Sequence, residues 1–403
     1  MTRATERFAR DGAAAVTEFW ADVTRRTTPI IEPFPTDTSF ILATFVYRDT
    51  LHAKTIQVSG GAAGWVDWLT RLEPIAGTDI WYKTVVLPRT VRVGYQFRVD
   101  DDEGLLPWYL DPKFGARFAK WHGDRLNPNV DSTMRVRGAR SKLIGPGADP
   151  QPYTVRRADV AHGTLDSLSV DSRILGQHRR AWMYTPPLTG SRRTPLPLLV
   201  MFDGGAYTAD AYVPTPTILD NMLAAGKIAP IAALFVDNGP ARMTELGCDS
   251  TFARFVVDEL LPLVRRRYAV TRDPLQTAVG GSSHGGLAAT CAALRFPRTF
   301  GMVISQSGSY WWAPPNEDYE WPARTFASRP KLPLRFYLDV GVLETDRSSG
   351  DGPGQVITNR HFRDVLRARG YDVLYQEFVG AHEYFNWRGT ISTALERFFP
   401  PLR

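Results

Sequence analysis

The sequence predicts an α/β domain over residues 151–403, preceded by a smaller β-sandwich over residues 1–150. Three observations support this division. Aromatic and β-branched runs of strand length dominate the first part. A segment rich in proline and glycine follows at residues 145–152, and apolar runs then alternate with amphipathic helical patterns. Such alternation is typical of a parallel sheet that helices cover on both faces.

The first domain shows strand patterns at Phe40–Tyr47, Ile80–Leu87 and Val91–Val99. The last two are separated by Pro88-Arg89-Thr90, which is a turn signal. Apart from the first 26 residues, this part of the chain shows little helical periodicity. These features predict a small antiparallel sandwich.

The second domain contains short apolar runs that predict strands. They lie at Leu196–Phe202, Ile231–Val236, Gln276–Gly280, Met302–Ser305, Leu334–Val340 and Val373–Val379. Helical patterns lie between several of these runs, at Phe252–Arg267, His284–Phe296 and Gln355–Arg369. Active sites of parallel sheets form at the carboxyl ends of the strands, so residues directly after each strand are the candidates for chemistry.

The composition is ordinary for a globular protein, with 43% hydrophobic and 22% charged residues among 403. It excludes a disordered or fibrous chain. No apolar run reaches the about 18 residues that span a membrane, and the charged N-terminus lacks the apolar core of a secretory signal. The net charge of +6 permits an anionic small-molecule substrate, but it is too thinly spread to indicate nucleic-acid binding. The sequence does not indicate an oligomeric state.

The only cysteines in the sequence are Cys248 and Cys291. Two cysteines are too few for a disulfide framework, and no metal-ligand spacing surrounds them. We therefore expect a reducing, cytoplasmic compartment, no metal and no other cofactor.

The segment Gly281-Ser282-Ser283-His284-Gly285 follows a predicted strand and opens a predicted helix. It matches the pattern G-x-S-x-G, in which a nucleophilic serine occupies a tight strand-to-helix turn, as in α/β-hydrolase domains. Ser283 is the predicted nucleophile because it has glycine two positions before and after it, where side chains would collide with the strand and helix. The backbone N–H of His284 is expected to stabilise an oxyanion, whereas the His284 side chain is expected to point away along the helix.

In this fold, an acid and then a histidine follow the nucleophile along the chain. His382 lies in a loop after a predicted strand, where a general base is required, whereas His361 falls within a predicted helix. The acid is expected after the preceding strand, and Glu344 is the preferred candidate because its loop can reach His382. Asp346 in the same loop and Asp339 at the end of the strand are alternatives.

A second oxyanion donor is expected from the loop after an early strand of the sheet. The segment Asp203-Gly204-Gly205-Ala206 occupies this place, and its glycines let the backbone approach a substrate closely. The N–H of Gly205 or of Ala206 is the expected donor.

Several longer segments carry a family resemblance. They are GGSSHGGLAAT (280–290), FPRTFGMVISQSGSYWW (296–312), FVGAHEYFNWR (378–388) and RMTELGCDSTFARFVVDELLPLVRRRY (242–268), with EFW, GTDIWY and DRLNPN in the first domain. They resemble the enterochelin (enterobactin) esterases and related trilactone siderophore hydrolases over nearly the whole chain. The resemblance implies a cytoplasmic serine esterase that opens the ester backbone of a ferric catecholate siderophore and frees iron for reduction.

Aromatic and arginine side chains near the predicted site are expected to contact the substrate. They are Arg242, Trp311, Trp312, Trp387 and Arg388. Stacking and cation–π contacts from such residues suit a catechol ring and an anionic complex. Packing in the core is the alternative for Trp311 and Trp312.

Other functions are compatible with the same scaffold. A feruloyl or other carbohydrate-type carboxylesterase and an acyltransferase are alternatives, and so is a binding protein that has lost turnover, although an intact set of serine, acid and histidine argues against the last. Residues 156–403 have the length that an α/β-hydrolase domain needs. We therefore expect the first domain to form one wall of the substrate cleft rather than to help assemble the triad.

Overall fold

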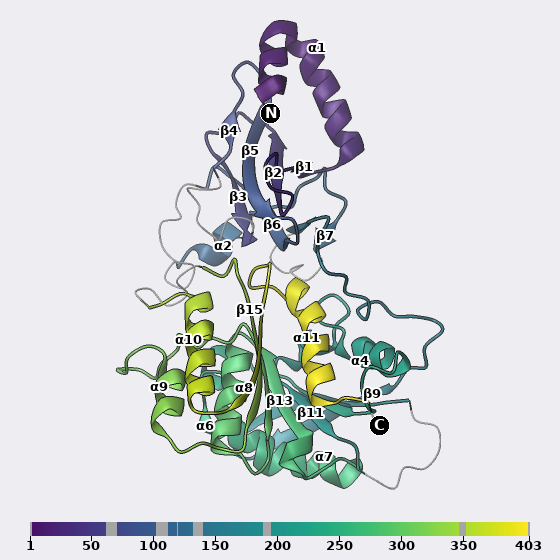
Figure 1. Cartoon of the computed structure of the whole chain (residues 1–403), viewed down its shortest axis with the longest axis vertical. Coiled ribbons are helices and arrows are strands. Elements are labelled where there is room, and N and C mark those ends of the chain that lie inside the picture. Colours follow the sequence, from purple (N-terminus) through teal and green to yellow (C-terminus); the bar gives the residue numbers. More distant parts are fainter. Residues whose placement is uncertain are drawn as a thin grey trace. The chain divides into compact units, whose positions relative to one another are not determined.

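The computed structural model describes residues 2–61, 71–101, 112–118, 120–131, 140–187, 195–345 and 352–401. The chain forms two compact units, and Figure 1 labels many of their elements. The first unit comprises Met1–Asp149 together with Val379–Phe385. The second comprises Pro150–Phe378 and Asn386–Arg403. The sequence suggested a single division near residue 150. The segment Val379–Phe385 lies after this division in the chain but belongs to the first unit.

Among its described residues, the first unit contains two antiparallel four-stranded sheets. Its strands are β1 (Ile30–Pro33), β2 (Phe40–Arg48), β3 (Ile56–Gly60), β4 (Glu73–Pro74), β5 (Ile80–Pro88), β6 (Arg92–Val99), β7 (Val130–Asp131) and β8 (Arg140–Ile144). The strand orders are β1-β2-β5-β4 and β3-β6-β8-β7. Between the sheets, the rings of Phe45 and Tyr95 lie 4.9 Å apart and those of Tyr47 and Phe97 lie 5.1 Å apart. The predicted antiparallel sandwich is confirmed.

Helix α1 (Thr2–Arg26) packs on the sheet that contains β2 and β5. Trp20 and Val23 on the helix are buried against Val46 and Ile80. The indole N–H of Trp20 also donates a hydrogen bond of 2.8 Å to Asp79. The helical pattern of the first 26 residues is therefore confirmed. A short helix, α2 (Phe114–Phe118), precedes β7.

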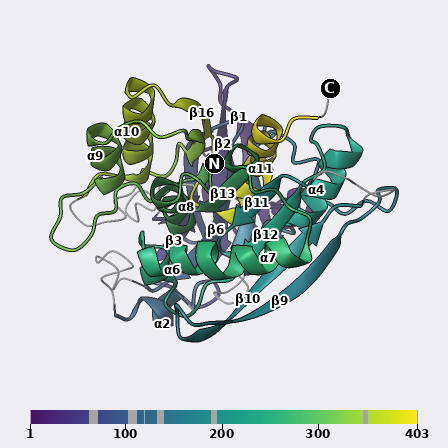
Figure 2. The ribbon, with the colours of Figure 1, turned by 90° about the horizontal axis from the view of Figure 1, so that it is seen from below.

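Within the described residues, the second unit is built on an eight-stranded sheet with the order β16-β15-β14-β13-β11-β12-β10-β9. Its strands are β9 (Thr164–Ser172), β10 (Gln177–Thr185), β11 (Leu198–Met201), β12 (Ala232–Val236), β13 (Thr277–Ser282), β14 (Met302–Gln306), β15 (Arg335–Gly341) and β16 (Asp372–Phe378). Strands β11 to β16 pair in parallel. Figure 2 shows the antiparallel pair β9 and β10 at one edge. The predicted α/β fold class is confirmed, and the buried central strands explain the continuous apolar runs.

Helices connect the strands of the second unit. They are α3 (Gly204–Thr208), α4 (Thr215–Ala224), α5 (Arg242–Glu245), α6 (Ser250–Arg254), α7 (Leu261–Arg267), α8 (His284–Arg295), α9 (Trp321–Ser328), α10 (Gln355–Ala368) and α11 (Tyr384–Phe398). A π-helical stretch, Phe255–Leu260, joins α6 to α7. The wider turn is consistent with Pro262, which has no N–H and whose ring excludes the carbonyl four residues earlier. Across the described residues, no helix is both long enough and apolar enough to cross a membrane.

Sequence patterns did not reveal the hairpin of β9 and β10. Strand β9 reads TLDSLSVDS and is exposed along most of its length, with only Leu168 and Ser172 buried. A strand at the edge of the sheet that buries so few side chains does not need the apolar run that marks a central strand. The missing signal of β9 therefore reflects its exposed position at the edge of the sheet.

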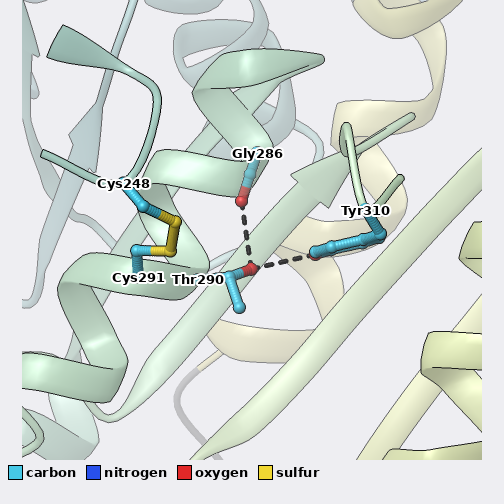
Figure 3. The surroundings of a disulfide bond; sticks show 5 residues. All are labelled: Cys248, Gly286, Thr290, Cys291 and Tyr310. Carbon is cyan, nitrogen blue, oxygen red and sulfur yellow. Dashed lines mark hydrogen bonds between the residues drawn. A yellow bond between two sulfur atoms is a disulfide. The ribbon is translucent and has the colours of Figure 1, made fainter. Parts of the chain in front are cut away.

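Cys248 and Cys291 form a disulfide that joins the segment after α5 to α8, as Figure 3 shows. Their Cα atoms lie 5.4 Å apart, as is usual for a disulfide. Beside Cys291, the Thr290 hydroxyl donates to the Gly286 carbonyl (3.0 Å) and shares a hydrogen bond of 2.9 Å with the Tyr310 hydroxyl. Because disulfides are rare in the cytosol, the cysteines do not support the predicted reducing compartment.

Candidate active site

Ser283 lies at the turn between β13 and α8 and has an unusual backbone conformation. Its φ is 56° and its ψ is −124°, and a non-glycine residue held in such a region costs about 1–3 kcal/mol. Backbone hydrogen bonds hold it there. The Ser283 N–H donates to the Gln306 carbonyl (2.9 Å), and the Ser283 carbonyl accepts from the N–H groups of Leu287 and Ser309 (3.1 Å each). This is the geometry that lifts a serine hydroxyl above the end of a sheet.

Close packing explains the glycines around Ser283. A Cβ on Gly281 would lie 2.7 Å from the carbonyl carbon of Gly285. A Cβ on Gly286 would lie 2.5 Å from Ser305 Oγ, and one on Gly285 would lie 3.2 Å from Asp203 Oδ2. The strand and the helix therefore approach each other only because these positions carry no side chain.

The Ser283 hydroxyl has a polar neighbour that the sequence did not point to. Ser309 Oγ lies 3.4 Å from Ser283 Oγ and 3.1 Å from His284 Nδ1. The expectation that the His284 side chain points away along the helix is wrong, because this side chain is buried and turned toward Ser309. The position of Ser309, shortly after β14, is the signal that could have identified it.

The loop after β11 holds the predicted oxyanion donors. Helix α3 begins at Gly204, directly after Asp203, whose φ is 55°. The Ala206 N–H already donates to the Asp203 carbonyl (2.8 Å). Among the described residues, no hydrogen bond from the Gly205 N–H is found. The first N–H groups of a helix have no partner within it, so Gly205 is the better candidate of the two.

Arg242 fixes the residue that precedes this loop. Its Nε and Nη2 each lie 2.6 Å from an oxygen of the Asp203 carboxylate, and the Asn238 amide donates to the same group. Asp203 is only 7% exposed, whereas 35% of the Arg242 side chain is exposed. The contact between Arg242 and substrate stays a prediction, and the bidentate pair shows that Arg242 also orders the loop of Gly205.

The predicted acid candidates differ in their surroundings. Glu344 is buried after β15, and its Oε1 accepts hydrogen bonds from the Ser307 hydroxyl (2.6 Å) and the Gly341 N–H (2.8 Å). Asp339 is fully buried within β15, and burial raises the pKa of its carboxyl to about 7. Asp346 lies outside the described residues. Glu344, which lies in the loop after β15 and accepts two hydrogen bonds on one oxygen, therefore stays the preferred candidate over Asp339, which lies within the strand.

His382 is partly exposed in the loop between β16 and α11. This loop, Val379–Phe385, is part of the first compact unit, whereas the serine turn and Glu344 belong to the second. The expectation that residues 156–403 hold the triad without help from the first domain stays a prediction. His361 lies exposed on α10, as the sequence suggested.

Trp311 and Trp312 have different surroundings. Trp311 is half-buried, its ring lies 5.5 Å from that of His284, and its N–H donates to Gln355 (2.8 Å). Trp312 packs beside the disulfide and lies 6.1 Å from the ring of Trp321. Trp311 is therefore suited to contact a ligand at the serine turn, and the surroundings of Trp312 favour a packing role.

The last two predicted substrate contacts lie on α11. Trp387 is 3% exposed and donates a hydrogen bond of 3.0 Å to Ser307 Oγ. Arg388 donates a hydrogen bond of 2.9 Å to the Gln151 side chain. Burial favours a structural role for Trp387, and the contact between Arg388 and substrate stays a prediction.

The second unit therefore gathers three groups at the carboxyl ends of parallel strands. A strained serine follows β13, N–H groups follow β11, and a buried carboxylate follows β15. In such an arrangement a serine hydroxyl attacks a carbonyl carbon while N–H groups stabilise the developing oxyanion. In the part of the chain that the structure describes, no group of three or more His, Cys, Asp or Glu side chains could hold a metal ion.

Comparison with known proteins agrees with this geometry. The esterase family model matches residues 172–398, more than half of the chain, and the model of the enterochelin esterase N-terminal domain matches residues 42–154. The chain belongs to the enterochelin esterase family.

Relatives within the enterochelin esterase family match over most of their length. The iron(III) enterobactin esterase of Dickeya dadantii is 29% identical, over 92% of this chain and 90% of the relative. The iron(III) salmochelin esterase of Escherichia coli is 26% identical, over 94% of this chain and 92% of the relative. The crystal structure of the ferric enterobactin esterase from Salmonella typhimurium has a TM-score of 0.75 at 25% identity, covering 94% of this chain and 98% of that one.

Replacing Gly281 with alanine tests the packing of the serine turn. We expect Gly281→Ala to destabilise the protein by about 1–3 kcal/mol, because the new Cβ would overlap the backbone of Gly285. Gly205→Ala is the matched control for stability. The atom nearest to its new Cβ would be Asp237 Oδ1 at 3.6 Å, which is an ordinary van der Waals distance. Urea unfolding of both variants and the wild type measures the difference, and a Gly281→Ala protein as stable as the wild type would contradict the packing.

Proposed function

We propose that the protein is a serine esterase that hydrolyses the ester bonds of a catecholate trilactone siderophore such as ferric enterobactin. Ser283 is the nucleophile, His382 the general base and Glu344 the acid. The observation that carries the proposal is the strained Ser283 backbone at the end of β13, beside N–H donors and a buried carboxylate. The family relatives that are named as iron(III) enterobactin and salmochelin esterases support the choice of substrate.

The first half of the reaction opens a lactone ester. Ser283 Oγ attacks the ester carbonyl carbon while His382 accepts the hydroxyl proton. The N–H groups of His284 and Gly205 stabilise the negative charge on the carbonyl oxygen, and the N-terminus of α8 adds its dipole. The C–O bond of the ester then breaks, His382 passes its proton to the leaving alkoxide, and the acyl group remains on Ser283.

The second half releases the acyl group. A water molecule gives a proton to His382 and attacks the acyl carbon, and the proton then returns to Ser283 Oγ as the C–O bond to the serine breaks. Glu344 holds the imidazole in the required tautomer and stabilises its charged form.

Hydrolysis weakens the hold of the siderophore on its iron(III) cargo. Three catechol groups on one ring bind the metal with a high effective concentration, which falls when the ring is opened and then cut apart. The substrate complex is anionic, so the net charge of +6 suits its binding. The half-buried Trp311 beside the serine turn suits stacking on a catechol ring.

Mass spectrometry of the reaction products tests this function. We expect the protein to add one water to a catecholate trilactone for each ester opened, in the iron(III) form and the free form, and to leave a feruloylated sugar intact. Ser283→Ala should lower kcat by about 10³-fold or more, since a triad acts as a unit. Ser282→Ala is the control, because the buried Ser282 hydroxyl has no hydrogen-bond partner among the described residues. Full turnover by Ser283→Ala, or cleavage of the feruloyl ester alone, would refute the proposal.

A pair of isosteric variants identifies the acid. Glu344→Gln should lower kcat for a p-nitrophenyl ester by about 10²–10⁴-fold at unchanged KM, because the imidazole loses its charged partner. Asp339→Asn should leave kcat near the wild-type value, because the Asp339 side chain is buried within β15, where it accepts a hydrogen bond of 2.9 Å from the Tyr337 hydroxyl, and is not the proposed partner of the imidazole. The opposite order of effects would assign the role to Asp339, and two active variants would exclude both residues.

A further inference from the structure

The loop that carries His382, Val379–Phe385, is held by β6 of the first unit at both of its ends. The Val379 carbonyl accepts a hydrogen bond of 3.0 Å from the Arg92 N–H. At the other end, the Arg92 guanidinium lies 5.1 Å from the centre of the Phe385 ring. One residue of β6 therefore contacts the loop on both sides of His382.

The residue directly before His382 is also fixed. Ala381 is completely buried in the first unit. A Cβ on Gly61 would overlap the Ala381 methyl group. The same Cβ would lie 3.0 Å from one methyl carbon of Val93. The Ala381 methyl group thus lies directly against Gly61.

The residue directly after His382 is fixed by a buried ion pair. The Glu383 carboxylate pairs with the Arg140 guanidinium of β8 and accepts a hydrogen bond of 2.8 Å from the Gly94 N–H of β6. Only 4% of the Arg140 side chain and 2% of the Glu383 side chain are exposed. A Cβ on Gly94 would lie 2.8 Å from Arg140 Nη2, so the guanidinium also rests on the backbone of β6. Charge-assisted bonds of this kind constrain geometry more strongly than neutral ones.

A general base requires such precision. Loops are usually the more mobile parts of a fold, and a misplacement of about 1 Å at a reacting group costs about 10²-fold in rate. We propose that Glu383 and Arg140 are positioning residues, whose buried pair fixes the backbone from which His382 presents its imidazole. The inference rests on the proposed function, in which His382 is the base.

Two conservative variants test the proposal in the full-length protein. Arg140→Lys keeps the charge but loses the forked contact, and Glu383→Asp shortens the acidic side chain by one methylene. Active sites are first counted with excess fluorophosphonate, and kcat and KM for p-nitrophenyl butyrate are then measured per titrated site. Positioning predicts a kcat about 10- to 100-fold lower at unchanged KM. A purely structural role predicts fewer titrated sites, each with the wild-type kcat, and this result would overturn the proposal. If Arg140→Lys does not fold, Glu383→Asp decides alone.

Two further variants separate the possible outcomes. Arg360→Lys is the matched control, because it loosens the ion pair between Arg360 and Glu377 of β16, outside the loop, and should leave kcat unchanged. His382→Gln tests the base itself, and wild-type turnover by this variant would refute the proposed function. If His382→Gln is inactive while Arg140→Lys and Glu383→Asp keep the wild-type kcat per site, the positioning role alone is refuted.

Discussion

The backbone conformation of Ser283 is the constraint on which the rest of the site depends. A non-glycine residue with a φ of 56° persists only where its surroundings leave it no alternative. Here β14, α8 and the segment after β14 each bond to the Ser283 backbone, and the glycines at Gly281 and Gly286 let strand and helix approach. The hydroxyl and the first N–H groups of α8 are therefore in place before a substrate arrives, which is the preorganisation that electrostatic catalysis needs.

The end of β14 connects Ser283, the proposed nucleophile, to Glu344, the proposed acid. Ser309 Oγ lies beside Ser283 Oγ, and two residues earlier the Ser307 hydroxyl donates to Glu344. Gln306, the last residue of the strand, extends the contacts through its amide group to α3 and α11. Because these groups are buried and bonded to one another, movement of one of them leaves others unsatisfied. Helix α3, the serine turn and Glu344 are thus held as one network within the second unit.

The sequence predicted those features that have local signals. Buried parallel strands require continuous apolar runs, and a tight strand-to-helix turn requires its glycines, so the sheet and Ser283 could be found from short segments. The sequence favoured Glu344 but left Asp346 and Asp339 open as alternatives, because the burial and hydrogen bonds of a carboxylate have no local sequence pattern. The membership of the His382 loop in the first unit could not be predicted, because the pair of Arg140 and Glu383 joins residues 243 positions apart and leaves no local pattern.

We propose that the backbone conformation at the end of β13 makes Ser283 the nucleophile. Reaction of the protein with a fluorophosphonate, followed by proteolysis and tandem mass spectrometry, tests it directly, because such reagents attach to an activated serine. A single adduct on Ser283 is expected, and the Ser283→Ala protein should take up none. An adduct on Ser282 or Ser309 in the wild type, or no adduct at all, would contradict the claim.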